Sequence, residues 1–148
     1  LAVNVGAMLS SFISIIALLN YFLGLLGFSI ETILGTIFRP LAWTMGIPWS
    51  ESSAVGSLMG KKIVFTEFVA FADLKSLMDS KEISERAAII TSYALCGFAN
   101  FGSIGIQLGG IGGIAPKRRK EIAQIIFKAM IGGAIASWLT AALAGILL

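Results

Sequence analysis

The chain lacks histidine altogether and has a single cysteine, Cys96, among its 148 residues. It therefore cannot by itself build a disulfide framework, a Cys/His zinc site or a histidine-dependent catalytic triad. No nucleophile–base pair can be assembled from what remains, so an enzyme is not expected.

Charged residues are also scarce: 13% of the chain is charged and 57% is hydrophobic, with a mean hydropathy of +0.91. Soluble domains average about 25% charged residues, so this chain cannot cover a water-facing surface. The composition predicts a multi-pass protein of the cytoplasmic membrane. The net charge of +3 is too small an excess to indicate a nucleic-acid partner.

The first 30 residues carry no charge and show no basic segment of the kind that opens a secretory signal. They are typical of the interior of a longer membrane protein. We therefore expect the chain to be a fragment, or one half of a larger unit.

Three stretches are apolar enough to span a bilayer, whose core takes about 20 residues of helix. Residues 1–30 and 87–116 are uncharged, and residues 122–148 carry only Lys128. Lys128 lies near the start of its stretch, where a long side chain can reach the interface.

Two segments between the first two stretches do not read as simple spans. Residues 29–50 have one apolar helical face and two tryptophans, Trp43 and Trp49, which predicts an interfacial helix. An amphipathic helix packed on the protein is the alternative. Residues 51–73 have two short apolar arms, each about half the length of a span, which predicts a re-entrant hairpin.

Orientation follows from four consecutive positive charges at residues 117–120. Cytoplasmic loops collect lysine and arginine, so this loop is expected inside and the C-terminus outside. The sequence thus predicts an all-α integral membrane protein with these segments: a scaffold span (1–28), interfacial helix (29–50), hairpin (51–73), outer loop (74–86), broken span (87–115), basic loop (116–121) and last span (122–148).

The middle span carries polar residues beside flexible glycines, among them Asn100 and Ser103 on one helical face. Transporters hold substrates at helix breaks of this kind. A polar clamp between helices remains the alternative interpretation.

Glu67 lies within an apolar arm of the predicted hairpin, and a buried carboxylate there indicates a functional site. A vicinal diol of a sugar or ribose would satisfy it, because a carboxylate accepts two hydrogen bonds. An ion pair with Lys61 or Lys62 is the competing explanation.

Small residues recur every four positions at Gly105, Gly109 and Gly113, and again in the last span from Gly133 through Ser137 to Gly145. This spacing is typical of close helix packing. We expect Cys96 to be a buried, small apolar residue.

Three stretches resemble the C-terminal half of concentrative nucleoside transporters: GKKIVFTEFVAF (60–71), SYALCGFANFGSIGI (92–106) and LGGIGGIAPKRRKEIAQIIFKA (108–129). PLAWTMGIPWSE (40–51) fits the same family. The resemblance implies one half of an inverted-repeat transporter, assembled from three protomers that each hold a substrate site.

The resemblance also implies roles for individual residues. Glu67 matches the glutamate that holds the ribose hydroxyls, Asn100 and Ser103 match the polar pair that contacts ribose, and Phe98 matches an aromatic that packs on the sugar. Thr66 and Gly102 depart from the usual Asn and Ser, which bears on substrate range and coupling ion. The family's coupling ion, Na⁺ or H⁺, is expected to bind mainly in the half that this chain lacks, with no other cofactor.

The leading hypothesis is therefore ion-coupled nucleoside uptake by alternating access. A nucleoside-binding membrane sensor or regulatory subunit that does not translocate is the alternative, and a plain helical assembly subunit is a third reading.

Overall fold

The computed structural model describes residues 2–148, apart from the side chain of Glu31, and every regular element in that range is helical. The helices, in order, are α1 (Ala2–Gly24), α2 (Ile30–Thr44), α3 (Ser52–Val64), α4 (Glu67–Asp79), α5 (Glu85–Leu95), α6 (Phe101–Ile114), a 3₁₀ turn η1 (Pro116–Arg118) and α7 (Arg119–Leu147).

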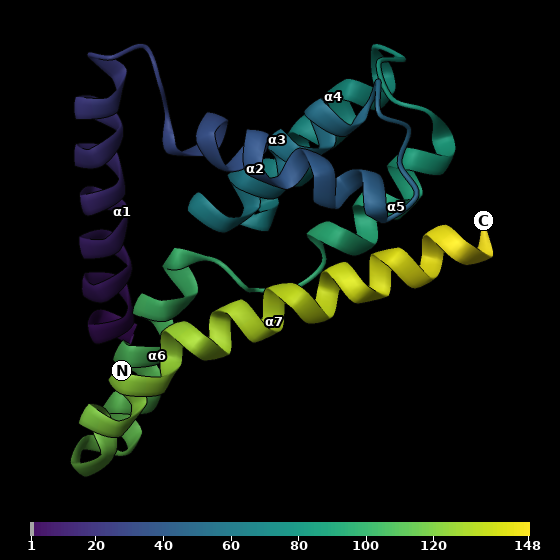
Figure 1. The fold of residues 1–148 in the computed structure, drawn as a ribbon. Helices are drawn as coiled ribbons and strands as arrows, with labels where there is room; N and C mark the ends of the chain where they lie inside the picture. The colour runs from purple at the N-terminus through teal and green to yellow at the C-terminus, as the bar shows by residue number, and fades with distance from the viewer. Residues whose placement is uncertain (1) are drawn as a thin grey trace.

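The helices form two groups that are joined by α7 (Figure 1). In one group α1 packs along α6, and in the other α2, α3, α4 and α5 pack together. The long α7 begins beside α6 and continues past α5, so it contacts both groups.

Within residues 2–148, two helices are long and apolar enough to cross a membrane: Ala2–Gly24 with 23 residues and Pro116–Leu147 with 32. The middle stretch, expected to span as a broken helix, consists of α5 and the 14-residue α6, separated at residues 96–100. Gly97 has φ +111, a left-handed conformation that favours glycine. It turns the chain where α5 ends.

Helix α2 packs closely on α3. Its Ala42 is buried and its Leu34 and Phe38 are half-buried, whereas Ile33 and Ile37 of the expected apolar face stay exposed. The helix is thus packed on the protein and also presents an apolar outer side.

The segment 74–86, expected as a hydrophilic loop, is helical through Asp79 and again from Glu85. Its charges suggested a loop, but Leu74 is buried and Leu77 packs on the core, so α4 continues as an amphipathic helix. The connection between α4 and α5 is therefore short and consists of residues 80–84. The basic segment 116–121 likewise forms η1 and the first turn of α7, because Pro116 starts a helical turn.

Two buried apolar clusters fill the interior. One joins α2–α5 with the C-terminal part of α7, and the other joins the end of α3 with α6 and the middle of α7. Phe38 and Trp138 pack against both clusters, and their ring centroids are 5.2 Å apart. This aromatic pair therefore links the two clusters.

Small residues allow the closest helix contacts. A Cβ added at Gly109 would lie 2.9 Å from the Asn4 carbonyl oxygen of α1, and one at Gly105 would lie 3.0 Å from the Met8 carbonyl oxygen. The packing role expected for these two glycines is confirmed. Gly145, in the last span, likewise meets the Met45 backbone.

Gly56→Ala should destabilise the packing of α2 on α3, because the new Cβ would lie 2.5 Å from the Gly35 carbonyl oxygen. Forcing such a group into a packed contact typically lowers the free energy of unfolding by about 1–3 kcal/mol. The measurement is thermal unfolding of the purified protein. Gly132→Ala is the matched control, since that Cβ meets nothing within 4 Å. Equal melting temperatures for the two variants would contradict the assigned packing.

Candidate functional site

The break between α5 and α6 is organised by Asn100, the N-cap residue of α6. Its Oδ1 accepts a hydrogen bond from the Ser103 backbone N–H at 2.7 Å, and Ser103 Oγ accepts one from the Asn100 N–H at 3.3 Å. This reciprocal capping box satisfies two N–H groups at the start of α6. The Asn100–Ser103 pair is thus a cap at the start of α6.

Glu67 is buried, with 8% of its surface exposed, and is the first residue of α4. One oxygen, Oε2, accepts a hydrogen bond from Asn100 Nδ2 at 3.0 Å. A helix N-terminus favours a negative charge. The amide of Asn100 therefore caps α6 with its oxygen and holds the α4 carboxylate with its nitrogen.

The competing ion pairs with Glu67 are not formed among the described side chains. Lys61 pairs with Asp73, and the two side chains are about one-third exposed. Lys62 donates to oxygens of α5 and α7. The ion-pair explanation of Glu67 is therefore wrong in this structure.

Lys62 is a residue whose role sequence reasoning missed. It is fully buried, and its Nζ donates to the carbonyl oxygens of Ala94 at 2.9 Å and Cys96 at 3.4 Å and to Ser137 Oγ at 2.9 Å. The sequence signal was present, because a lysine in an apolar arm needs partners. Its targets lie 32 to 75 positions away, which no local spacing indicates.

Ser137 belongs to the small-residue pattern of the last span, and the packing expected of that pattern is confirmed at Gly145 and at the fully buried Ala141. Ser137 does more than pack. Its Oγ accepts from Lys62 and donates to the Ala134 carbonyl oxygen at 2.9 Å.

Phe98 is 67% exposed and lies within the break. Together with Ser103 it lines a hollow of about 200 Å³ between the break and α7. Pockets for small organic ligands measure about 300–1,000 Å³, so this hollow lies below that range, and neither Glu67 nor Asn100 lines it. Cys96, expected to be buried, is exposed, because it follows the last residue of α5 and leaves the packed face of that helix.

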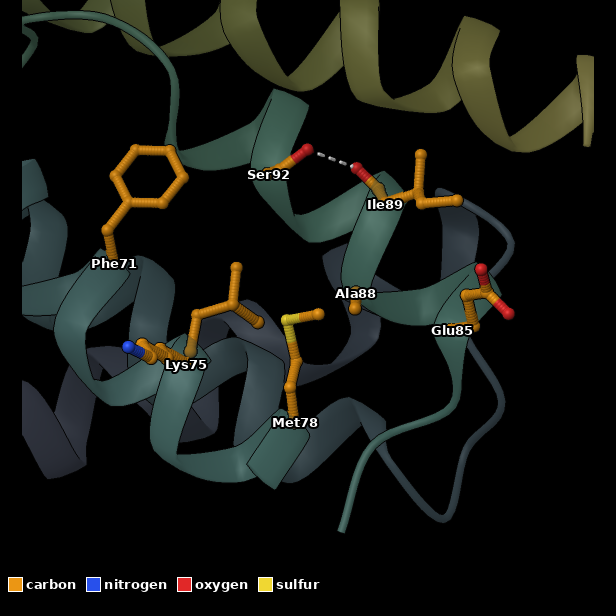
Figure 2. A pocket seen from close by; sticks show the side chains of 8 residues that line it. Phe71, Lys75, Met78, Glu85, Ala88, Ile89 and Ser92 are labelled. Carbon is orange, nitrogen blue, oxygen red and sulfur yellow. Dashed lines mark hydrogen bonds between the residues drawn. The ribbon is translucent and has the colours of Figure 1, made fainter. Parts of the chain in front are cut away.

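A different hollow, of about 390 Å³, lies between α4 and α5 (Figure 2). Apolar side chains such as Phe71, Met78 and Ile89 line it, and Lys75 and Glu85 lie along it. None of the four site residues expected from the sequence lines this hollow. The candidate site is therefore the Glu67–Asn100–Ser103 network with Phe98 beside it.

The family described as "Na+ dependent nucleoside transporter C-terminus" matches residues 1–145. The chain belongs to the concentrative nucleoside transporter family. It is 47% identical, over 98% of its length, to "Uncharacterized transporter YutK" of Bacillus subtilis, and 41% identical, over 97%, to "Sodium/nucleoside cotransporter 1" of Rattus norvegicus. These matches cover 37% and 25% of the two relatives, so the chain spans about a quarter to two-fifths of such proteins.

Solved structures of the transporter CNTnw have the same fold. A variant in an outward-facing state matches 99% of this chain and 38% of its own length with a TM-score of 0.92 at 39% identity. The inward-facing, substrate-bound state matches 97% of this chain and 36% of its own length with a TM-score of 0.77 at 41% identity. The chain is thus an all-helical membrane transporter segment of this family, and the family is one of transporters and not of enzymes.

Asn100→Asp should keep the oxygen that caps α6 but place an acceptor where Nδ2 now donates to Glu67. Two carboxylates at this distance disfavour ionisation, and the lost bond leaves Glu67 without its donor. We expect the free energy of unfolding to fall by about 1–3 kcal/mol, measured by thermal or denaturant unfolding of the purified protein.

Ser103→Ala is the control for this prediction, because it removes a capping bond but leaves the Asn100–Glu67 bond in place. Its loss of stability should be smaller. An Asn100→Asp protein as stable as the parent would contradict the assigned network.

Proposed function

We propose that the protein takes up nucleosides across the cytoplasmic membrane in an ion-coupled, alternating-access cycle, and that this chain supplies the ribose-binding residues Glu67, Phe98, Asn100 and Ser103. The buried pair of Glu67 and Asn100 at a helix break carries the proposal. Ionisable groups inside membrane segments are costly and mark substrate pathways.

The pair has the chemistry that a ribose requires. The Glu67 carboxylate can accept hydrogen bonds from two vicinal hydroxyls, and the Asn100 amide can donate one to a ribose oxygen. In this structure the two side chains satisfy each other, at 3.0 Å. A bound ribose would share the carboxylate with the amide, while the exposed ring of Phe98 would cover its apolar face.

The names of the relatives support nucleosides as substrates, and one is named a sodium cotransporter. We therefore favour Na⁺ over H⁺ as the coupling ion. Its ligands are proposed to lie mainly in segments outside this chain, which covers 25–37% of the relatives described above.

Alternating access is supported by the likeness to CNTnw. The TM-score falls from the outward-facing to the inward-facing state although sequence identity stays within 39–41%. The difference therefore reflects how corresponding helices are arranged in the two states. The hairpin of α3 and α4 is proposed to move as part of the unit that carries the substrate.

Assembly and orientation are proposed from the exposed surface of α1 and from the charge of the loop before α7. Helix α1 buries only Ile16 and exposes apolar side chains such as Leu18 and Phe22, which suits contact with lipid or with other protomers of a homotrimer. The basic segment 117–120 is proposed to lie inside and the C-terminus outside.

Glu67→Gln keeps the side-chain shape but makes each bond to a ribose hydroxyl neutral. Charge-assisted bonds are roughly twice as strong, so uridine affinity should fall by about 1–3 kcal/mol, or about 5- to 150-fold. The loss should be smaller for 2′-deoxyuridine or 3′-deoxyuridine, because fewer bonds then depend on the charge. The measurement is binding or uptake with the full-length protein.

Gly132→Ala is the control variant here, because the added Cβ would meet nothing within 4 Å and residue 132 is not one of the four proposed site residues. It should leave uridine affinity unchanged. If Glu67→Gln weakens all three nucleosides equally, or none, the ribose role is wrong.

Orientation is tested with cysteines placed at Asp79, where α4 ends, and at Arg119, where α7 begins. A membrane-impermeant thiol reagent should label position 79 in intact cells and position 119 only after permeabilisation. The reverse pattern would overturn the orientation.

A further inference from the structure

Lys62 of α3 places a cation at the end of α5, on the other side of the gap in sequence from the α6 cap that Asn100 forms. Lys62 lies in the last turn of α3, five residues before Glu67 at the start of α4. It is fully buried, and among the described side chains no carboxylate lies within ion-pair distance of its ammonium.

The ammonium is nevertheless fully hydrogen-bonded. It has three donors, and three oxygens receive them: the carbonyl oxygens of Ala94 and Cys96 and the Oγ of Ser137. A cage of two carbonyls and a hydroxyl at the end of an unwound helix is the type of environment in which transporters bind small cations. Here the ammonium of Lys62, a cation that belongs to the chain itself, occupies the cage.

The position of this cage explains why a charge is stable there. Helix α5 ends at Leu95, so the carbonyl groups around Ala94 and Cys96 have no partner within the helix. The C-terminus of a helix also carries partial negative charge. Lys62 thus donates hydrogen bonds to the carbonyl groups at the end of α5, as Asn100 accepts one from an N–H group at the start of α6.

We infer that Lys62 is a positioning residue for substrate binding: its ammonium acts as a built-in cation that fixes the end of α5 against the hairpin and α7, and so places Phe98 and Asn100 toward the ribose. This inference rests on the proposed nucleoside function. The hairpin holds both sides of the break, through Lys62 on α3 and Glu67 on α4, so hairpin and break move as one body.

The first test compares Lys62→Met with Lys61→Met in the purified full-length protein. Removing the ammonium strands buried acceptors, so Lys62→Met should weaken uridine binding about tenfold or more. Lys61→Met is the matched control, because its ion pair with Asp73 is partly exposed and such pairs contribute little; affinity should stay within about twofold. Equal affinities for the two variants would overturn the inference.

Chemical rescue separates the charge from the volume of the side chain. Lys62→Ala removes three methylenes and the ammonium. Added n-propylammonium would replace both the carbon chain and the charge, whereas n-propanol has a similar shape but no charge. Propylammonium should restore uridine affinity to Lys62→Ala, and propanol should not. Equal rescue by propanol would reduce Lys62 to a space-filling role and overturn the inference.

A measurement without nucleoside keeps this inference separable from the proposed function. Hydrogen–deuterium exchange of residues 94–100 should be faster in Lys62→Met than in the parent, with α2 unchanged. A parent protein that binds no nucleoside would refute the proposed function, while the exchange experiment would still report on the cation at the break.

Ser137→Ala removes one of the three acceptors and retains the lysine, so it remains informative if the lysine variants do not accumulate. It should give intermediate uridine affinity and intermediate exchange at residues 94–100. Values equal to those of the parent would overturn the inference.

Discussion

A helix interrupted within apolar surroundings exposes carbonyl groups on one side of the gap and N–H groups on the other, and neither set has water to bind. The arrangement of the hairpin in this chain follows from that constraint. Lys62 donates to the carbonyls that end α5, and Asn100 caps the N–H groups that begin α6. Lys62 comes from α3, and the Asn100 amide in turn binds the Glu67 carboxylate of α4.

The same groups that stabilise the break also form the candidate binding site. Asn100 is shared between the α6 cap and the Glu67 carboxylate, so a ligand bound at Glu67, as proposed above, would act on a residue that holds the helix end. In the proposed cycle, this shared residue would couple substrate binding to the position of α4 without a separate relay. The Phe38–Trp138 contact and the glycines of α6 supply the rigid packing around this adjustable centre.

The four candidate site residues differ in exposure. Phe98 is 67% exposed and lines a hollow of about 200 Å³, whereas Glu67, Asn100 and Ser103 are buried. In transporters built from repeats, substrates lie at the interface between repeats. Under the proposed function, the chain would contribute one wall of such an interface.

Composition and local spacing were enough to predict a helical membrane protein, a break in the helix near Gly97 and a carboxylate in an apolar setting at Glu67, which the structure buries. These features depend on hydropathy, on the conformational freedom of glycine and on the cost of burying charge, which are all local properties. The family resemblance, carried by short motifs around the same residues, pointed to nucleosides.

The tertiary structure alone decided which polar groups meet. Lys61 binds Asp73, Lys62 reaches Ser137 from 75 positions away, and Cys96 is exposed where a buried residue was expected. The charges of residues 74–86 suggested a loop, whereas packing of Leu74 on the core kept α4 helical. Sequence determines which groups need partners, but the choice of partner depends on distances between helices that lie far apart along the chain.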